Sequence, residues 1–276
     1  MLDRFGPRLQ ERIRALGPLC VGIDPSSALL TSWDRPDSIE GAEFFALSLL
    51  EAAIGHAAAI KPQIAYFERF GAAGYGVLER LFLEARDADV LIIADAKRGD
   101  IGSTNDGYAF AWLDERSPLC ADAVTLSPYT GVDALAPFFN YTQGGKGVFI
   151  LAATSNDEGR PLQTARLDGD EAVEDMVLRQ VAERNGGGDE LGSIGVVLGA
   201  TRQRPRFDLT RVHGPFLVPG VGAQGATPDQ VGRLFDRCPP NSVLVNVSRA
   251  LASAGPERSG LRDAVRRWRD DLSSTL

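Results

Sequence analysis

The chain has 276 residues, 44% of them hydrophobic and 24% charged, and its formal net charge at neutral pH is −8. A globular chain of this length and composition can bury a core of its own. The acidic balance argues against a nucleic-acid-binding surface, because such surfaces depend on clustered lysine and arginine, but it leaves room for one basic pocket that binds a small anion.

Cysteine and histidine usage narrows the chemistry further. Cys20, Cys120 and Cys238 lie far apart, which argues against a disulfide framework or a cysteine zinc site and favours a reducing cytoplasm. His56 and His213 alone offer little material for a histidine metal cluster or a serine–histidine hydrolase. No apolar stretch approaches the ~18 residues of a membrane span, and the N-terminus lacks a signal- or transit-peptide pattern. We therefore expect a cytoplasmic protein that binds no membrane.

In chain order, the sequence alternates short apolar runs with segments of helical periodicity. Amphipathic spacing predicts an N-terminal helix over 2–16. The expected strands are 19–23, 57–60, 90–94, 123–126, 147–152, 194–198, 216–218 and 243–247. The expected helices between and after them are 42–54, 76–85, 133–139, 172–183, 228–237 and 261–272. A polar stretch at 154–170 is predicted to be a long loop insertion after the fifth strand.

The repeat of these elements indicates the fold class. Eight strand–helix units of roughly 30 residues match the βα repeat, and continuously apolar strands favour a parallel sheet covered on its outside. Eight units in about 250 residues favour an α/β protein with a closed (β/α)₈ barrel, formed by residues 1–276 as a single domain. An open, doubly wound sheet would show the same alternation.

Charged residues follow three consecutive strands of the expected barrel. Active sites of such barrels lie at the C-terminal ends of the strands. Asp24 follows the first strand, Lys61 follows the second, and the third continues into Asp95, Lys97 and Asp100. Residues two apart on a strand share a face, so Asp95 and Lys97 should point the same way. Any one of these could be a solvated loop residue, but together they favour a site.

A glycine-rich segment follows the seventh expected strand. Pro219 leads into Gly220, Gly222 and Gly225, which satisfy the pattern G-x-G-x-x-G. Its late position, and the missing acidic residue about 20 positions on, argue against a dinucleotide site. Such a turn is typical of half a phosphate site, with bare backbone N–H groups facing the anion and a helix N-terminus behind them. Arg249, after the eighth strand, can pair with phosphate through two hydrogen bonds. An ordinary tight turn is the alternative.

These residues carry a resemblance to a known family. The segment DAKRGDIGST, from Asp95 to Thr104, resembles the signature of orotidine 5′-phosphate decarboxylases, in particular their longer type 2 bacterial form. Related sugar-phosphate barrel enzymes share the D-x-K-x-x-D element, but its combination with the preceding lysine and the G-V-G-A-Q-G loop is specific. The match extends over nearly the whole chain, through Asp24, Lys61, Ser155, the 219–225 loop and Arg249.

The resemblance implies conversion of orotidine 5′-monophosphate to UMP in pyrimidine biosynthesis, without metal or cofactor. It implies a charge network of Lys61, Asp95, Lys97 and Asp100, in a homodimer whose shared sites take Asp100 and Thr104 from the partner subunit. Asp95 would face the substrate carboxylate, while Lys97 would stabilise and protonate C6. The implied substrate contacts are Asp24 and Lys61 to the ribose, Ser155 to the pyrimidine, and Gln224 and Arg249, with loop residues Pro219, Gly220 and Gly222, to the phosphate.

Two other functions remain open at this point. A related barrel lyase could act on a sugar phosphate through magnesium, but it would need another carboxylate near Asp95, where Lys61 stands instead. A non-catalytic nucleotide-phosphate-binding protein could keep the glycine loop and Arg249, but it would have no use for Lys97 between two aspartates.

Overall fold

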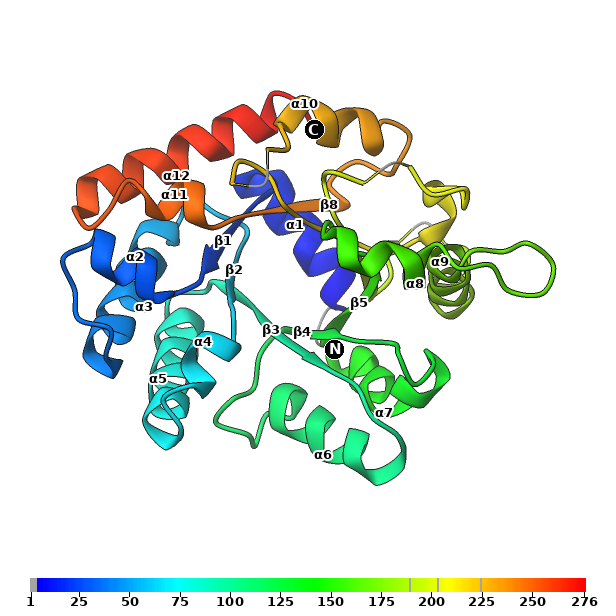
Figure 1. Ribbon diagram of the computed structural model, residues 1–276, viewed down its shortest axis with the longest axis horizontal. Coiled ribbons are helices and arrows are strands. Elements are labelled where there is room, and N and C mark those ends of the chain that lie inside the picture. Colours follow the sequence, from blue (N-terminus) through cyan, green and yellow to red (C-terminus); the bar gives the residue numbers. More distant parts are fainter. Residues whose placement is uncertain (1–3, 189, 203, 224) are drawn as a thin grey trace.

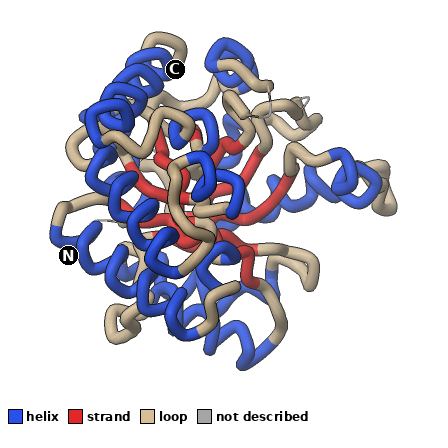
Figure 2. Tube along the Cα trace, turned by 60° about the vertical axis from the view of Figure 1, so that its left-hand side comes forward, coloured by secondary structure: helices blue, strands red, loops and turns tan. Residues whose placement is uncertain are grey.

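The computed structural model describes residues 4–188, 190–202, 204–223 and 225–276. Within these ranges eight parallel strands follow one another in sequence order and close into a barrel, since β1 pairs with both β2 and β8 (Figures 1 and 2). The single-domain (β/α)₈, or TIM, barrel that the sequence predicts is thus confirmed. The strands are β1 (Leu19–Ile23), β2 (Ala59–Pro62), β3 (Leu91–Arg98), β4 (Ala123–Leu126), β5 (Gly147–Ala153), β6 (Ile194–Leu198), β7 (Phe216–Pro219) and β8 (Val243–Val247).

The helices surround the strands and cover the outside of the barrel (Figure 2). The longer ones are α1 (Phe5–Leu16), α3 (Ile39–Ala53), α5 (Ala72–Asp87), α6 (Gly102–Leu113), α9 (Val173–Asn185) and α12 (Arg258–Ser273). The short ones are α2 (Ser27–Ser32), α4 (Ala65–Glu68), α7 (Ala136–Phe139), α8 (Arg160–Gln163), α10 (Pro228–Leu234) and α11 (Arg249–Ala252). No helix in the described part of the chain is long and apolar enough to cross a membrane.

Most expected elements form close to their expected bounds, with informative exceptions. Strand β3 runs four residues further than expected, to Arg98, and the 154–170 segment contains a 3₁₀ turn at Asp157–Gly159 followed by α8. The sequence pattern did not predict helix α6. Its buried residues Asn105, Ala109, Trp112 and Leu113 have helical spacing, but the first of them is polar, so the apolar stripe is too short to be recognised.

Helix α1 closes the N-terminal end of the barrel. Phe5, Leu9 and Ile13 are buried against apolar side chains of the barrel interior, and Figure 1 shows α1 lying across it. The Phe5 ring meets the Phe149 ring edge-on, with centroids 6.0 Å apart. At Gly147 an added Cβ would come within 2.2 Å of the Phe5 ring, so only glycine lets the helix pack this closely. The barrel interior next to α1 is therefore apolar.

Candidate active site

A cavity of about 330 Å³ lies at the C-terminal end of the barrel, where the sequence places the site. Each strand contributes to its wall, either with a residue near its own end or with the residue that follows. These residues are Asp24 after β1, Lys61 on β2, Asp95 and Lys97 on β3, Thr125 on β4, Leu151 on β5, Val197 on β6, Leu217 and Pro219 on β7, and Asn246 on β8.

Asp95 lies at the centre of the polar network in this cavity. Its Oδ2 accepts hydrogen bonds from Lys61 Nζ at 2.6 Å and from Gln63 Nε2 at 3.1 Å. Its Oδ1 accepts from Lys97 Nζ at 2.6 Å and from Thr125 Oγ1 at 2.9 Å. A carboxylate offers about four acceptor sites, so this one is saturated by two ammonium groups and two neutral donors.

Burial and charge act against each other in this network, and charge prevails. The side chains of Lys61 and Asp95 are only 5% and 9% exposed, whereas that of Lys97 is 45% exposed. Burial alone would raise the pKa of Asp95, but the ammonium groups of Lys61 and Lys97 hold it well below its usual range. Burial alone would lower the pKa of Lys61, but the carboxylates of Asp95 and Asp24 raise it instead. The buried pair therefore stays ionised across the physiological pH range.

Lys97 reaches Asp95 through irregular backbone rather than through strand alternation. The pairing of β3 with β4 shifts register between Ala94 and Arg98, and Lys97 within this bulge has a φ of +47°. That left-handed conformation is costly for a residue with a side chain. The backbone N–H of Lys97 donates to Thr125 Oγ1 at 3.0 Å. Asp95 and Lys97 thus meet, as expected, but a bulge brings them together.

Within the described part of the chain, three oxygens on the neighbouring wall are buried without a hydrogen-bond partner. They are Asp24 Oδ1, Asn246 Oδ1 and Ser248 Oγ, and all three residues line the cavity. Gly22 makes room for them, because an added Cβ there would lie 2.6 Å from Ser248 Cβ. Buried polar atoms are nearly always satisfied, so this wall fits a ligand that brings hydroxyls or other donors.

The glycine loop after β7 needs glycine at several positions. Gly220, Gly222 and Gly225 have φ angles of +104°, +76° and +84°, a region that glycine enters without steric cost. An added Cβ at Gly222 would also lie 2.8 Å from Ala250 Cβ. The sequence therefore specifies the shape of this loop and seats it against the start of α11.

The loop amides differ from the sequence-based expectation. In this conformation Gly222 N donates to Ala226 O at 2.9 Å, and Gly225 N donates to Gly222 O at 3.0 Å. These two N–H groups are engaged inside the loop instead of facing an anion. Pro219, Gly220 and Arg249 line the cavity, whereas Gly222 is not among the lining residues.

Comparison with known proteins agrees with this geometry. The family model described as "Orotidine 5'-phosphate decarboxylase / HUMPS family" matches residues 17–264. The chain is 45% identical over 276 residues to orotidine 5′-phosphate decarboxylase of Salinispora arenicola, covering 100% of this chain and 99% of the relative. The chain belongs to the orotidine 5′-phosphate decarboxylase family. The family predicted from the sequence is thereby confirmed.

Further relatives and solved structures cover the whole barrel. The Streptomyces coelicolor orotidine 5′-phosphate decarboxylase is 43% identical over 277 residues, spanning 100% of this chain and 99% of its own. A Streptomyces avermitilis structure assigned the same name superposes with a TM-score of 0.95 at 43% identity, covering 99% and 96% of the two chains. The structure of the Leishmania donovani OMP decarboxylase superposes with a TM-score of 0.77 at 32% identity, covering 99% and 98%.

Besides Gly222, two further site residues predicted for this decarboxylase lie outside its own cavity. Asp100 and Thr104 are not among the lining residues, and Thr104 is exposed on the first turn of α6. The Asp100 backbone is held in place by Asn105, whose side chain accepts from Asp100 N at 2.9 Å and donates to Asp100 O at 2.6 Å. Thr130 Oγ1 donates to the same carbonyl at 3.0 Å. Gln224, the remaining predicted phosphate contact, lies outside the described residues.

The structure also adds residues that the sequence reasoning missed. Gln63, Thr125 and Asn246 line the cavity with the predicted Asp24, Lys61, Asp95, Lys97, Ser155, Pro219, Gly220 and Arg249. Gln63 follows Lys61 by two positions, which is a usable signal. Thr125 and Asn246 are polar residues inside otherwise apolar strands and are 1% and 7% exposed. A search for polar residues within the apolar runs would have found both.

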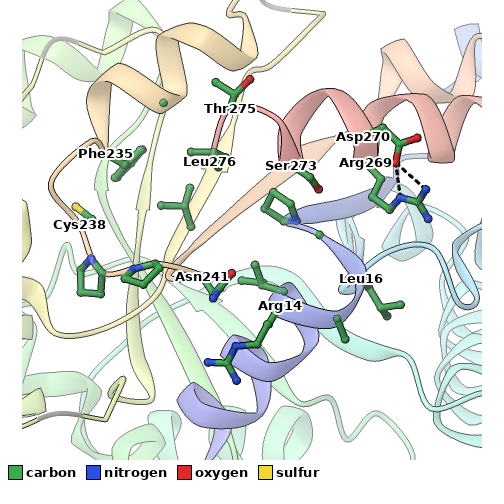
Figure 3. A pocket seen from close by; sticks show the side chains of 18 of the residues that line it. Arg14, Leu16, Phe235, Cys238, Asn241, Arg269, Asp270, Ser273, Thr275 and Leu276 are labelled. Atoms are coloured by element: carbon green, nitrogen blue, oxygen red, sulfur yellow. Dashed lines mark hydrogen bonds and ion pairs between the residues drawn. The ribbon is translucent and has the colours of Figure 1, made fainter.

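A larger cavity of the decarboxylase lies elsewhere. It has a volume of about 830 Å³ and lies at the N-terminal end of the barrel, between α1, α10 and the end of α12 (Figure 3). Its charged residues include Arg269 and Asp270, which bind each other at 2.6 Å. Since the ionised network around Asp95 lies at the opposite end of the strands, the smaller cavity is the candidate active site.

Proposed function

We propose that this decarboxylase converts orotidine 5′-monophosphate to UMP and carbon dioxide through Lys97, with Asp95 beside the substrate carboxylate. The observation that carries the proposal is the Asp95 carboxylate held between the ammonium groups of Lys61 and Lys97, each at 2.6 Å. The arrangement supplies a fixed negative charge and a proton donor side by side. It supports chemistry in which a substrate carboxylate is lost as carbon dioxide and a carbanion forms.

The cavity wall supports a division of the substrate into three parts. Asp24, with its unpartnered buried oxygen, and Lys61 would bind the ribose hydroxyls. Ser155, on the wall after β5, would bind the pyrimidine edge. Arg249 would bind the phosphate, together with Pro219 and Gly220 of the loop and with Gln224. Gly222, whose N–H donates to Ala226 O, would contribute to phosphate binding through the shape of the loop.

In the proposed step, a single lysine supplies the proton that replaces the lost carboxylate. The bond from C6 to the carboxylate breaks, its electron pair stays on C6, and carbon dioxide leaves. The Lys97 ammonium stabilises that pair electrostatically and then gives its proton to C6, which leaves a neutral amine. Because the Lys97 side chain is 45% exposed, solvent can reprotonate it after the product leaves.

The size of each electrostatic effect shows whether Asp95 or Lys97 would contribute more to the rate. Two like charges about 4 Å apart repel by roughly 4 kcal/mol at an effective dielectric of 20, which is about a thousandfold in rate. Asp95 is already bound by two ammonium groups, so its repulsion of a substrate carboxylate is smaller still. Stabilisation of the developing charge by a preorganised Lys97 must therefore supply more. Phosphate binding energy can contribute where it is realised only in the transition state.

We propose further that the reaction uses neither metal nor organic cofactor. The support is that ammonium groups occupy both sides of Asp95, where a cation would otherwise bind. Dialysis against EDTA should leave the rate unchanged. A rate lost on dialysis and restored by magnesium would instead favour the sugar-phosphate lyase.

The proposed homodimer accounts for Asp100 and Thr104, which lie outside the cavity of their own chain. Between them Ile101 is 63% exposed, which suits a loop that enters a partner subunit. The test mixes two inactive homodimers, Lys97→Ala and Asp100→Ala. A heterodimer has one site with both groups intact, so random exchange should restore about a quarter of wild-type sites. Exchange verified by mass, without recovered activity, would refute the shared site.

The enzyme would work in the reducing cytoplasm. The support is that Cys20, Cys120 and Cys238 are all free thiols. A reductant should therefore change neither the activity nor the thermal stability of the protein.

The central test is Lys97→Ala, assayed by the ultraviolet absorbance change from orotidine 5′-monophosphate to UMP. Turnover should vanish, while UMP binding measured by calorimetry should persist, because the phosphate and ribose contacts remain. Activity within tenfold of wild type would overturn the role of Lys97. A wild-type protein that binds UMP but turns nothing over would be the nucleotide-binding protein instead.

A further inference from the structure

Thr125 is placed where one hydroxyl joins the two central groups of the site. Its Oγ1 accepts a hydrogen bond from the backbone N–H of Lys97 at 3.0 Å and donates one to Asp95 Oδ1 at 2.9 Å. The residue is 1% exposed, and it is the polar member of the strand Ala123–Leu126. The two bonds form a continuous path from the Lys97 backbone to the Asp95 carboxylate.

The bulge in β3 explains why this hydroxyl is needed. Ala94 pairs with Val124 and Arg98 pairs with Leu126, so Thr125 lies opposite the irregular segment that contains Lys97. The Lys97 backbone, at a φ of +47°, persists only if its surroundings enforce it. A partly buried amide left without an acceptor would work against that conformation. The Thr125 hydroxyl supplies the acceptor that the regular ladder would otherwise provide.

The donor half of the same hydroxyl fixes Asp95. A hydroxyl has one proton, and because its oxygen accepts from the Lys97 amide, the proton can point to Asp95 Oδ1. That oxygen also accepts from Lys97 Nζ at 2.6 Å. Backbone, carboxylate and ammonium are thus joined in one closed ring of contacts, which leaves the Lys97 side chain little freedom to swing away.

We propose that Thr125 is a positioning residue that aims the Lys97 ammonium by tying the Lys97 backbone to the Asp95 carboxylate. The inference rests on the proposed role of Lys97 and adds a residue that does not itself need to touch the reacting carbon. Packing alone would not require a hydroxyl here. The three strands that follow β4 place Leu151, Val197 and Leu217 in the wall of the same cavity, so an apolar side chain is compatible with this wall.

The decisive comparison is Thr125→Val with Thr125→Ser. Valine keeps the shape and removes both hydrogen bonds, whereas serine keeps the hydroxyl. The valine variant should lose about 10- to 100-fold in kcat, the range expected when a hydrogen bond to a charged group is lost. Its KM and its affinity for UMP should stay within about threefold, because ribose and phosphate contacts are intact. The serine variant should recover kcat to within about threefold of wild type.

Two further variants separate positioning from general destabilisation. Thr142→Val is the matched control, because Thr142 is also buried and its hydroxyl donates to Phe139 O at 2.7 Å, away from the cavity. It should leave kcat unchanged. Thr125→Ala, which removes the hydroxyl without β-branching, provides the same kinetic comparison if the valine variant does not fold.

The outcomes distinguish this inference from the proposed function. Lys97→Ala is measured in the same assay, and activity within tenfold of wild type there would overturn the role of Lys97 itself. If Lys97→Ala is inactive but Thr125→Val and Thr125→Ala keep wild-type kcat, only the positioning role fails. It also fails if serine is as impaired as valine, if the loss lies in KM alone, or if Thr142→Val lowers kcat equally.

Discussion

Replacing Lys61 by methionine should lower the free energy of unfolding by about 3 kcal/mol. The ammonium lies 2.6 Å from Asp95 Oδ2, and the two side chains are 5% and 9% exposed. At an effective dielectric of 20, two unit charges at that separation attract by about 6 kcal/mol, part of which offsets their desolvation. Removing one partner of a buried pair costs about 3 to 5 kcal/mol. Lys97 still neutralises Asp95 from the other side, which places the expected loss at the lower end.

A double-mutant cycle isolates the interaction. Asp95→Asn alone leaves Lys61 buried with the carboxylate of Asp24 as its remaining counter-charge, and should cost a similar amount. The double variant removes both charges of the buried pair, while Lys97, at 45% exposure, is solvated. Its loss should therefore fall short of the sum of the single losses by about 2 kcal/mol or more.

Urea unfolding followed by circular dichroism measures all four corners of this cycle. Lys146→Met is the control, since Lys146 is the other lysine of the chain and donates to Cys120 Sγ at 3.0 Å and Ala121 O at 3.1 Å rather than to a carboxylate. It should cost about 1 kcal/mol. Single losses that add within about 0.5 kcal/mol, or a Lys61→Met loss no larger than that of Lys146→Met, would refute the buried pair as a coupled unit.

Three other outcomes follow from the same geometry. Lys97→Arg should keep UMP binding within about threefold and lose turnover, because a guanidinium does not release its proton at neutral pH; turnover near the wild-type rate would contradict this. The lowered pKa of Asp95 stabilises the fold above about pH 4, and the raised pKa of Lys61 stabilises it below about pH 10. The free energy of unfolding, measured against pH, should therefore exceed that of the Lys61→Met/Asp95→Asn variant by a constant amount between these limits, and the difference should decline outside them. Phe5→Ala should cost about 3 to 5 kcal/mol in urea unfolding, because the ring is fully buried on Phe149, yet leave kcat within about threefold, since Phe5 does not line the active-site cavity.

The strands were predictable because their side chains are buried. Barrel strands are buried on both faces, so each reads as a continuous apolar run, and β1, β4, β6 and β8 have the expected bounds. Charged residues directly after such runs stand out for the same reason. Asp24, Lys61 and Asp95 were therefore accessible from the sequence alone.

The rest of the site depends on contacts between residues far apart in sequence. The bulge that turns Lys97 toward Asp95 is held by Thr125, which lies 28 positions further along the chain. The glycine loop was recognised from its pattern, but its internal hydrogen bonds, such as Gly222 N to Ala226 O, depend on the folded turn. The periodicity of apolar residues predicts which side chains are buried, but it does not predict which hydrogen-bond donor pairs with which acceptor.

Lysine is rare in this chain, and its positions are related to the proposed chemistry of the site. Of its 29 basic residues only three are lysines, and Lys61 and Lys97 are two of them. Elsewhere in the chain arginine binds carboxylates in a bidentate manner. Arg179, for example, donates hydrogen bonds to both carboxylate oxygens of Glu171, at 2.8 and 3.1 Å. Next to Asp95 each carboxylate oxygen receives one compact ammonium, and in the proposed mechanism the Lys97 ammonium also releases a proton. Under the proposed mechanism a lysine at position 97 can perform this transfer whereas an arginine cannot, and two of the three lysines in the chain line the active-site cavity.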